Sequence, residues 1–372
     1  MFFREVIKPP LGQDAFALGD DAAILTQAAV LLVLGMQLRG QTENLPTEDL
    51  HTLQIPPLHP SLGRTDSRGL REALANRYTA ALLGGPNTAE NVPWRRDIFE
   101  DLARNHFSKA EPSTALNLME ACLRHPHELV RVAAAAAYHD FSSEREKLTA
   151  ILDQGTRSSE ILIRDLAGTS LGQVAPEHPR LSELQRGGSR AAGGAASADT
   201  IMIVHGTLAR SFTWWQPQGD FHSYLRELRF DLYSEIDRFD WSGGYSDDAR
   251  DLGAHDLMRW VQSHKEQGLD VIAHSHGGNI AMLASTKGLQ IGKLLLLSCP
   301  VHFPKYRPDM TRVRKIISVR VRLDLVILAD RGGQKFQLSE IEENVLPIWF
   351  DHSATHNPGV WRNSTYNLPS KL

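Results

Sequence analysis

Two patterns of apolar and polar residues run along the chain, and one replaces the other near residue 200. Before that point the apolar residues recur at helical spacing. After it, short apolar runs rich in Val, Ile and Leu alternate with amphipathic helical segments. Such alternation is typical of α/β proteins, in which helices cover both faces of a largely parallel sheet. The pattern therefore predicts an all-α region followed by an α/β region.

The apolar runs of the second region define its predicted elements. Predicted strands lie within residues 200–207, 229–241, 269–275, 291–300, 315–326 and 343–352. Predicted helices lie within residues 211–228, 247–268 and 278–288. In open sheets of this kind, ligands bind at the carboxyl ends of the strands. Functional side chains are therefore expected directly after the apolar runs.

A linker separates the two regions in the sequence. Residues 185–199, "QRGGSRAAGGAASAD", combine Gly, Ala and Ser without apolar periodicity, which is how flexible linkers are composed. We expect an all-α helical domain over residues 1–184, a linker over 185–199 and an α/β domain over 200–372.

The helical region contains a short internal repeat. The segments "ELVRVAAAAAYHDF" and "ILIRDLAGTSLGQV" superpose with Arg131 over Arg164, and "WRRDIFEDLARNHF" is a poorer third copy. The pattern resembles the HEAT repeat, whose second helix often carries an apolar residue followed by Arg. By that resemblance the region is a HEAT-like helical domain. It would either offer a docking surface to a partner protein or support the second domain.

Charge and cysteine content narrow the classes of partner and compartment. The 372 residues carry 40 basic and 44 acidic side chains, a net charge of −4, without a basic run long enough to follow a phosphate backbone. This argues against a nucleic-acid partner. Cys122 and Cys299 are too few and too far apart for a disulfide framework, so we expect a reducing, cytoplasmic location.

The longest apolar stretch lies near the N-terminus. Residues 22–36 contain Thr26 and Gln27 and are fewer than the roughly 20 residues that a membrane span needs. Asp20 and Asp21 precede the stretch, where a signal peptide would have basic residues. We expect a buried helix here and no membrane span.

Ser275 has the most informative surroundings in the α/β region. In "VIAHSHGGNIA" it follows an apolar strand and precedes a helix of small residues, so it could be a helix N-cap. It also has small neighbours on both sides, Ala273 and Gly277, which a sharp strand-to-helix turn around a nucleophile requires. The pattern is Gly-x-Ser-x-Gly with Ala in the first place.

A serine nucleophile needs a histidine base and an acid that orients it. Asp324 and His352 follow the next predicted strands in that chain order, each at a strand end. Asp330 and His356 are the alternatives. Asp330 precedes Arg-Gly-Gly and is interpreted as a turn residue, whereas His356 precedes Asn-Pro, the expected start of a terminal helix.

With these motifs, residues 200–372 resemble a compact α/β-hydrolase. The resemblance implies that the backbone N–H groups of Thr207, in "VHGT", and of His276 form the oxyanion hole. It implies a Ser275–Asp324–His352 triad that cleaves carboxylic esters through an acyl-enzyme, without a cofactor. Only about fifteen residues, 301–315, separate two of the predicted strands, which leaves no room for a large lid and favours a small acyl substrate.

Two further classes of function stay open. The enzyme could be a thioesterase, an amidase or a lipid acyl hydrolase, because leaving-group preference depends on the shape of the pocket. The hydrolase-like half could instead be a catalytically silent binding module on the helical scaffold.

Several other residues near the predicted strand ends have less specific roles. We expect no metal site at His274 and His276, since neighbours of a serine at such a turn point to different sides. His205 is expected to form structural hydrogen bonds, and Cys299 to be a buried, unreactive thiol. Trp214 and Trp215 would line the acyl pocket or belong to the core.

Overall fold

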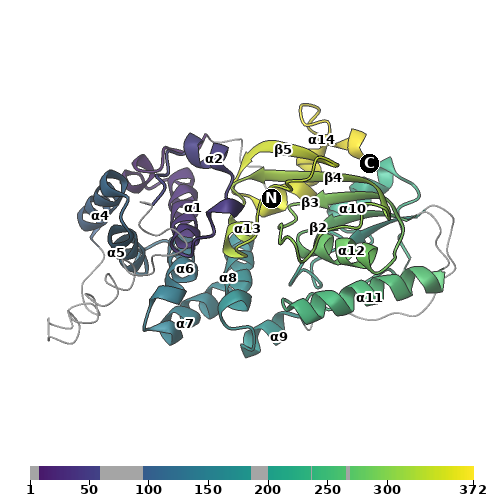
Figure 1. Ribbon diagram of the computed structural model, residues 1–372, viewed down its shortest axis with the longest axis horizontal. Helices are drawn as coiled ribbons and strands as arrows, with labels where there is room; N and C mark the ends of the chain where they lie inside the picture. The colour runs from purple at the N-terminus through teal and green to yellow at the C-terminus, as the bar shows by residue number, and fades with distance from the viewer. Residues whose placement is uncertain (1–7, 59–94, 186–199, 236, 265–268) are drawn as a thin grey trace. The chain divides into compact units, whose positions relative to one another are not determined.

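The computed structural model describes residues 8–58, 95–185, 200–235, 237–264 and 269–372 (Figure 1). The chain divides into two compact units, one ending at Val174 and the other containing Ala175–Leu372. This division precedes the expected boundary at residue 184, so helix α9 (Pro179–Gln185) is grouped with the second unit. Residues 186–199 of the expected linker lie outside the described residues.

All of the secondary structure in the first unit's described residues is helical. Its elements are η1 (Asp14–Ala17), α1 (Asp21–Leu38), η2 (Thr42–Asn44), α2 (Thr47–Thr52), α4 (Arg96–Lys109), α5 (Pro112–Cys122), α6 (Glu128–Tyr138), η4 (His139–Phe141), α7 (Arg145–Gly155) and α8 (Ile161–Val174). Helix α1 begins where the Asp20 carboxylate accepts the Ala23 N–H at 2.8 Å. It packs closely on α6, because a Cβ atom at Gly35 would lie 2.9 Å from the Cα atom of Ala137.

Helix α1 is the apolar stretch that the sequence marks as a buried helix. By length and composition it is the one helix among the described residues that could cross a membrane. Of its apolar window, 89% is buried inside the protein. This burial gives the apolar residues the environment that a membrane would otherwise supply.

The internal repeat of the sequence corresponds to equivalent contacts in α6 and α8. The Arg131 guanidinium donates to the carbonyls of His125 and Pro126, at 2.8 and 2.7 Å. The Arg164 guanidinium donates to the carbonyls of Ser158 and Ser159, at 2.9 and 3.1 Å. In both copies the arginine therefore closes the turn that precedes its own helix.

The second unit is built on a five-stranded sheet, and all of its strands are parallel. The spatial order β1-β2-β3-β4-β5 follows the chain, with β1 (Ile201–Val204), β2 (Asp270–His274), β3 (Ile291–Leu297), β4 (Val313–Arg322) and β5 (Ile341–Trp349). An α/β fold with a parallel sheet is what the alternating pattern predicts.

The predicted strand within residues 229–241 is wrong. Among the described residues of this segment, only Leu232 pairs with the sheet, in an isolated parallel bridge to Ile201. The residues around it are unsuited to a buried strand: Arg229 and Asp231 form an ion pair at 2.7 Å, and Phe230 is 86% exposed. The chain leaves the sheet edge after this bridge.

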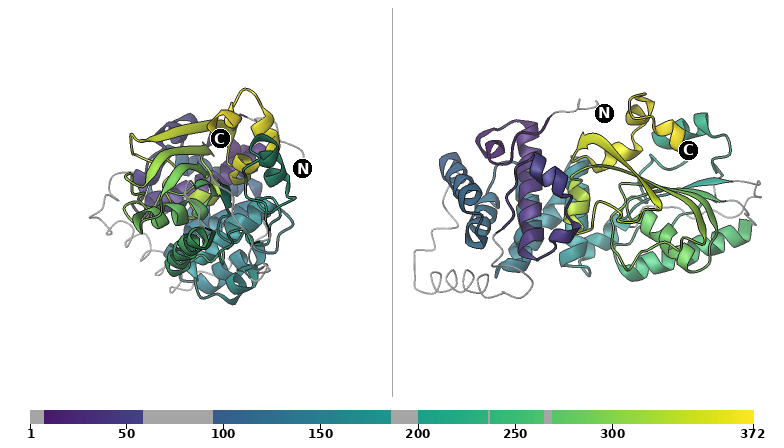
Figure 2. Two further views of the ribbon diagram at one scale, coloured as in Figure 1. Left: turned by 90° about the vertical axis from the view of Figure 1, so that its right-hand side faces the viewer. Right: turned by 45° about the horizontal axis from the view of Figure 1, so that its top comes forward.

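Helices cover both faces of the sheet. The remaining elements are α10 (Asp220–Leu228), α11 (Asp247–His264), α12 (His276–Thr286), α13 (Leu325–Ala329), η5 (His352–His356), α14 (Pro358–Arg362) and η6 (Leu368–Lys371). Helices α11 and α12 lie on one face, and α10 and α14 on the other (Figures 1 and 2). The predicted helix within 211–228 begins only at Asp220, and residues 265–268 of the predicted helix 247–268 lie outside the described residues.

Alternate residues of each strand enter two separate cores. Val204 packs on the side of Ile280 in α12, whereas Ile203 packs on the side of Phe221 in α10. Because both faces are apolar and covered, polar side chains of the sheet collect at its ends.

Candidate functional site

Strained backbone marks the carboxyl edge of the sheet. Residues with positive φ directly follow β2 to β5, and they are Ser275 (53°), Ser298 (45°), Leu323 (45°) and Phe350 (70°). Left-handed backbone costs on the order of 1–3 kcal/mol at such residues and persists where the surroundings enforce it, often at functional sites. The edge predicted to carry function is therefore also the strained edge.

Ser275 occupies the turn between β2 and α12, with φ 53° and ψ −135°. It stands at the N-cap position, but its side chain makes no capping hydrogen bond. The turn admits only glycine nearby: a Cβ atom at Gly277 would lie 2.5 Å from the Val204 oxygen, and one at Gly206 2.7 Å from the Ser275 Cβ atom. Capping thus does not account for Ser275.

Asp324 and His352 lie side by side, as their places after β4 and β5 predict. His352 Nδ1 lies 2.8 Å from Asp324 Oδ2, and both side chains are buried. The other oxygen, Oδ1, accepts the N–H groups of Val326 and Ile327 at the start of α13. Since the carboxylate accepts the Nδ1 proton, the neutral ring keeps its lone pair on Nε2.

The structure brings His352 to the residue that precedes Ser275. The rings of His274 and His352 have their centroids 4.6 Å apart. His352 therefore lies beside the strand end that leads into the Ser275 turn.

The two expected oxyanion donors flank Ser275. Gly206, next to Thr207, abuts the Ser275 Cβ atom, and His276 is the first residue of α12. Among the residues that the structure describes, neither backbone N–H has a hydrogen-bond acceptor. Both are free to donate to an incoming oxygen.

His205 holds the turn that carries Thr207, in keeping with the structural role expected for it. Its Nδ1 lies 2.8 Å from the Gly206 oxygen and its Nε2 3.3 Å from Asp240 Oδ1. Arg210 fixes Asp240 through two nitrogens, at 3.0 and 2.9 Å. The turn is thereby restrained through an Arg–Asp–His chain.

Four rings gather beside the serine. The His356 ring stacks on Trp214 at 4.1 Å, and His274 contacts Trp214, His352 and His356. Burial lowers the pKa of His356 to about 3 and, with its histidine neighbours, the pKa of His274 well below its usual value. Both rings are therefore neutral near pH 7. Sequence reasoning placed His356 at the start of α14, and Asn357 does cap that helix through the Gly359 N–H.

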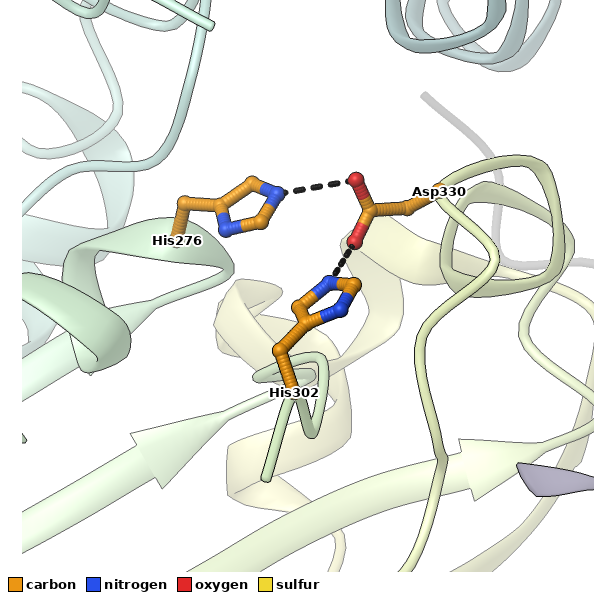
Figure 3. A group of neighbouring side chains, drawn as sticks. All are labelled: His276, His302 and Asp330. Atoms are coloured by element: carbon orange, nitrogen blue, oxygen red, sulfur yellow. Dashed lines mark hydrogen bonds and ion pairs between the residues drawn. The ribbon is translucent and has the colours of Figure 1, made fainter. Parts of the chain in front are cut away.

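Asp330 lies in a turn, as its sequence indicates, but it is buried at the centre of a polar cluster. It accepts hydrogen bonds from His276 Nε2 at 3.0 Å and from His302 Nε2 at 2.5 Å (Figure 3). It also accepts one from the Tyr245 hydroxyl. Sequence reasoning selected neither His302 nor this role for Asp330. The flanking side chains of Ser275 do diverge: His274 faces His352, whereas His276 faces Asp330.

Within the described ranges of the chain, His276, His302 and Asp330 form a group that could hold a metal ion. Their ligand atoms lie within 4.8 Å of one another. Arg250, however, places a guanidinium nitrogen 3.1 Å from His276 Nε2. Burial alone would lower the pKa of Arg250, but Asp330 and the nearby tyrosines raise it, so the group stays charged. A positive charge therefore already lies beside the cluster, where Asp247 also pairs with it at 3.0 Å.

Comparisons of the chain with models of known protein families, with curated proteins and with solved structures give no match. The class of the protein is therefore stated from its own geometry. It is an α/β protein with a parallel sheet, whose carboxyl edge carries a strained serine, a buried His–Asp pair and two backbone N–H groups that no described residue accepts.

Proposed function

We propose that residues 200–372 form a serine hydrolase that cleaves carboxylic esters through an acyl-enzyme. The observation that carries this proposal is the buried His352–Asp324 pair beside the strained turn of Ser275. The chain order Ser, Asp, His along successive strand ends supports an α/β-hydrolase fold. So does the bridge of Leu232 beside β1, which extends the sheet on the side away from β2.

The chemistry divides ester cleavage into two acyl transfers. Ser275 Oγ attacks the carbonyl carbon while His352 Nε2 takes the hydroxyl proton, and the carbonyl oxygen becomes an oxyanion facing the N–H groups of Thr207 and His276. Collapse breaks the bond to the alcohol, which leaves with the proton from His352. Water then repeats the steps on the acyl-enzyme, which releases the carboxylic acid and restores the serine.

Asp324 acts on the histidine and not on the substrate. It holds the Nδ1 proton, which keeps Nε2 directed to the serine, and it stabilises the imidazolium that forms in each transition state. The chain supplies the nucleophile, the base and the oxyanion donors from its own groups, so the proposed reaction needs no cofactor.

The short segment between β3 and β4 favours a small acyl substrate, since it cannot form a large lid. Thioesters, amides and lipid acyl esters use the same steps, and a screen that varies leaving group and acyl length separates them. Both cysteines are free and buried, in keeping with the proposed cytoplasmic location.

A second candidate is a catalytically silent binding module carried by a HEAT-like scaffold. The observation that favours it lies in the helical unit, where both copies of the repeat make the same arginine contact. The equivalent Arg131 and Arg164 contacts support a helical repeat that could dock a partner protein.

Labelling with a fluorophosphonate probe decides between the two, because the probe reacts only with an activated serine. We expect labelling of the native protein and of Ser298→Ala, and its loss in Ser275→Ala. Ser298 is a matched control, since it also follows a strand and has positive φ. A native protein that the probe does not label would favour the binding module.

A further inference from the structure

Residues 243–245 contact both sides of the expected oxyanion hole. The Gly243 oxygen accepts the N–H of Leu208, next to Thr207, at 2.9 Å. Two residues on, the Tyr245 hydroxyl donates to Asp330, which also accepts from His276. One short segment therefore links the Thr207 turn to the carboxylate that holds His276.

The ring of His276 is fixed at both nitrogens. The Asn279 amide lies 2.9 Å from Nδ1, while the Asn279 oxygen faces the Cys299 thiol at 3.6 Å. At the other nitrogen, Nε2 lies 3.0 Å from Asp330 Oδ1 and 3.1 Å from an Arg250 guanidinium nitrogen. The side chain of the first residue of α12 is therefore held in one orientation.

Burying the Asp330 carboxylate costs folding free energy unless the charge is paired and hydrogen-bonded. It is 2% exposed and takes no part in the His352–Asp324 pair. Interactions with His276 and His302 outweigh its burial and hold its pKa well below the usual range, so it is charged. Apolar residues can often replace a buried charged group without loss of stability, so the cluster calls for a role beyond stability.

We propose that Asp330 is a positioning residue that fixes both oxyanion donors. Through His276 it holds the start of α12, and through Tyr245 and Gly243 it restrains the Thr207 turn. It touches no substrate, and the inference rests on the proposed function. The site would thus have two carboxylates with separate roles: Asp324 orients the base, and Asp330 orients the groups that bind the developing oxyanion.

A metal ion at His276, His302 and Asp330 is the competing reading of the cluster. The charged Arg250 opposes it, because a divalent cation would repel a guanidinium held 3.1 Å from one of its ligand atoms.

The test compares Asp330→Asn with Asp237→Asn. Asp237 is a matched control of the same chemistry, since it is buried and accepts from the Tyr233 hydroxyl and from His264 Nε2 at 2.8 Å. The readouts are kcat and KM with an activated nitrophenyl ester, the rate of fluorophosphonate labelling, and inhibition by a trifluoromethyl ketone against its methyl ketone analogue.

We expect both variants to lower the melting temperature, but only Asp330→Asn to change the chemistry. Its kcat and labelling rate should fall by about 10- to 100-fold, while KM stays within about twofold. This fall is smaller than the about 10²- to 10³-fold cost of losing one oxyanion donor, because the variant displaces the donors and does not remove them. Inhibition by the trifluoromethyl ketone, which forms an oxyanion, should weaken in parallel, whereas inhibition by the methyl ketone should stay unchanged.

Three results would overturn the inference. Equal losses of kcat in the two variants would mean that Asp330 has only a structural role. Labelling of Asp330→Asn at the rate of the native protein would mean that the oxyanion hole does not depend on Asp330. Stoichiometric binding of Zn²⁺ to the native protein, lost in His302→Ala, would assign the cluster to a metal. A native protein that is not labelled at all would instead overturn the proposed function, on which the inference rests.

Discussion

The Nδ1 atom of His352 lies 2.8 Å from the Oδ2 atom of Asp324, and the two side chains come from the ends of adjacent strands. The second carboxylate oxygen accepts the N–H groups of Val326 and Ile327, so it cannot rotate freely. The orientation of the imidazole is therefore set by the start of α13.

Replacing Asp324 by Asn tests this arrangement directly. The amide oxygen can still cap α13, but an amide NH₂ facing Nδ1 would favour the tautomer with its proton on Nε2, which cannot accept from Ser275. We expect turnover of an activated ester to fall by about 10⁴-fold with a small change in melting temperature.

Asp351→Asn is the control for the acid. Asp351 is exposed, adjoins the same histidine and caps η5 through the Ser353 N–H. It should retain turnover within about twofold, as surface substitutions usually do. If Asp324→Asn were as active as Asp351→Asn, the acid would have to be sought elsewhere, first at Asp330.

The choice of base between His352 and His356 gives a second prediction. A general base works best with a pKa near the operating pH, and burial lowers the pKa of His356 to about 3. His352→Ala should abolish the acyl-enzyme burst with an activated ester, while His356→Ala should largely preserve it. A burst that survives in His352→Ala would remove that residue from the mechanism.

Local patterns in the sequence are sufficient to place the triad candidates. Ser275, Asp324 and His352 each follow an apolar run, and a parallel sheet brings the ends of such runs to one edge. The small residues around Ser275 also have a local cause, the steric limit of the turn at Gly277. The alternation of apolar runs likewise predicts the parallel sheet.

The Asp330 cluster has no such local pattern. Its members Tyr245, His276, His302 and Asp330 come from a loop, a helix start, the segment after β3 and the end of α13, and only tertiary packing joins them. The false strand at residues 229–241 failed for a related reason. Alternating apolar residues there resemble a strand, but the burial that would stabilise it is absent at Phe230.

The pH dependence of stability gives a third prediction. The pKa of His356 is about 3 in the folded protein, against about 6.5 in an unfolded chain. The unfolded state thus binds one more proton at acidic pH, so the stabilisation is complete above pH 6.5 and is lost as pH falls toward 3. Between pH 7 and pH 5 the native protein should lose about 2 kcal/mol on this account.

His356→Phe removes the group that binds this proton in the unfolded chain, and it keeps a ring that can stack on Trp214. Both proteins are unfolded in urea at pH 7 and at pH 5. The free energy of unfolding should fall in both, and the fall should be smaller in the variant than in the native protein by about 2 kcal/mol. Every tryptophan except Trp94 lies beyond residue 200, so fluorescence follows mainly the second unit. An equal fall in the two proteins would mean that His356 is protonated in the folded state.

The backbone at Ser275 gives the last prediction. Its φ of 53° and ψ of −135° are strained for any residue with a Cβ atom. Ser275→Gly should therefore be more stable than Ser275→Ala by about 1–3 kcal/mol, although glycine usually destabilises folded chains. Neither variant should label with a fluorophosphonate, since both lack the hydroxyl.

Urea unfolding of the native protein, Ser275→Ala and Ser275→Gly measures this difference, followed by tryptophan fluorescence. Gly19→Ala is a control for ordinary glycine entropy: nothing lies within 4 Å of an added Cβ atom there, and its φ is not positive. If Ser275→Gly were the less stable of the two Ser275 variants, the turn would be relaxed with a side chain present. Strain would then not explain why a serine without a capping bond occupies the start of α12.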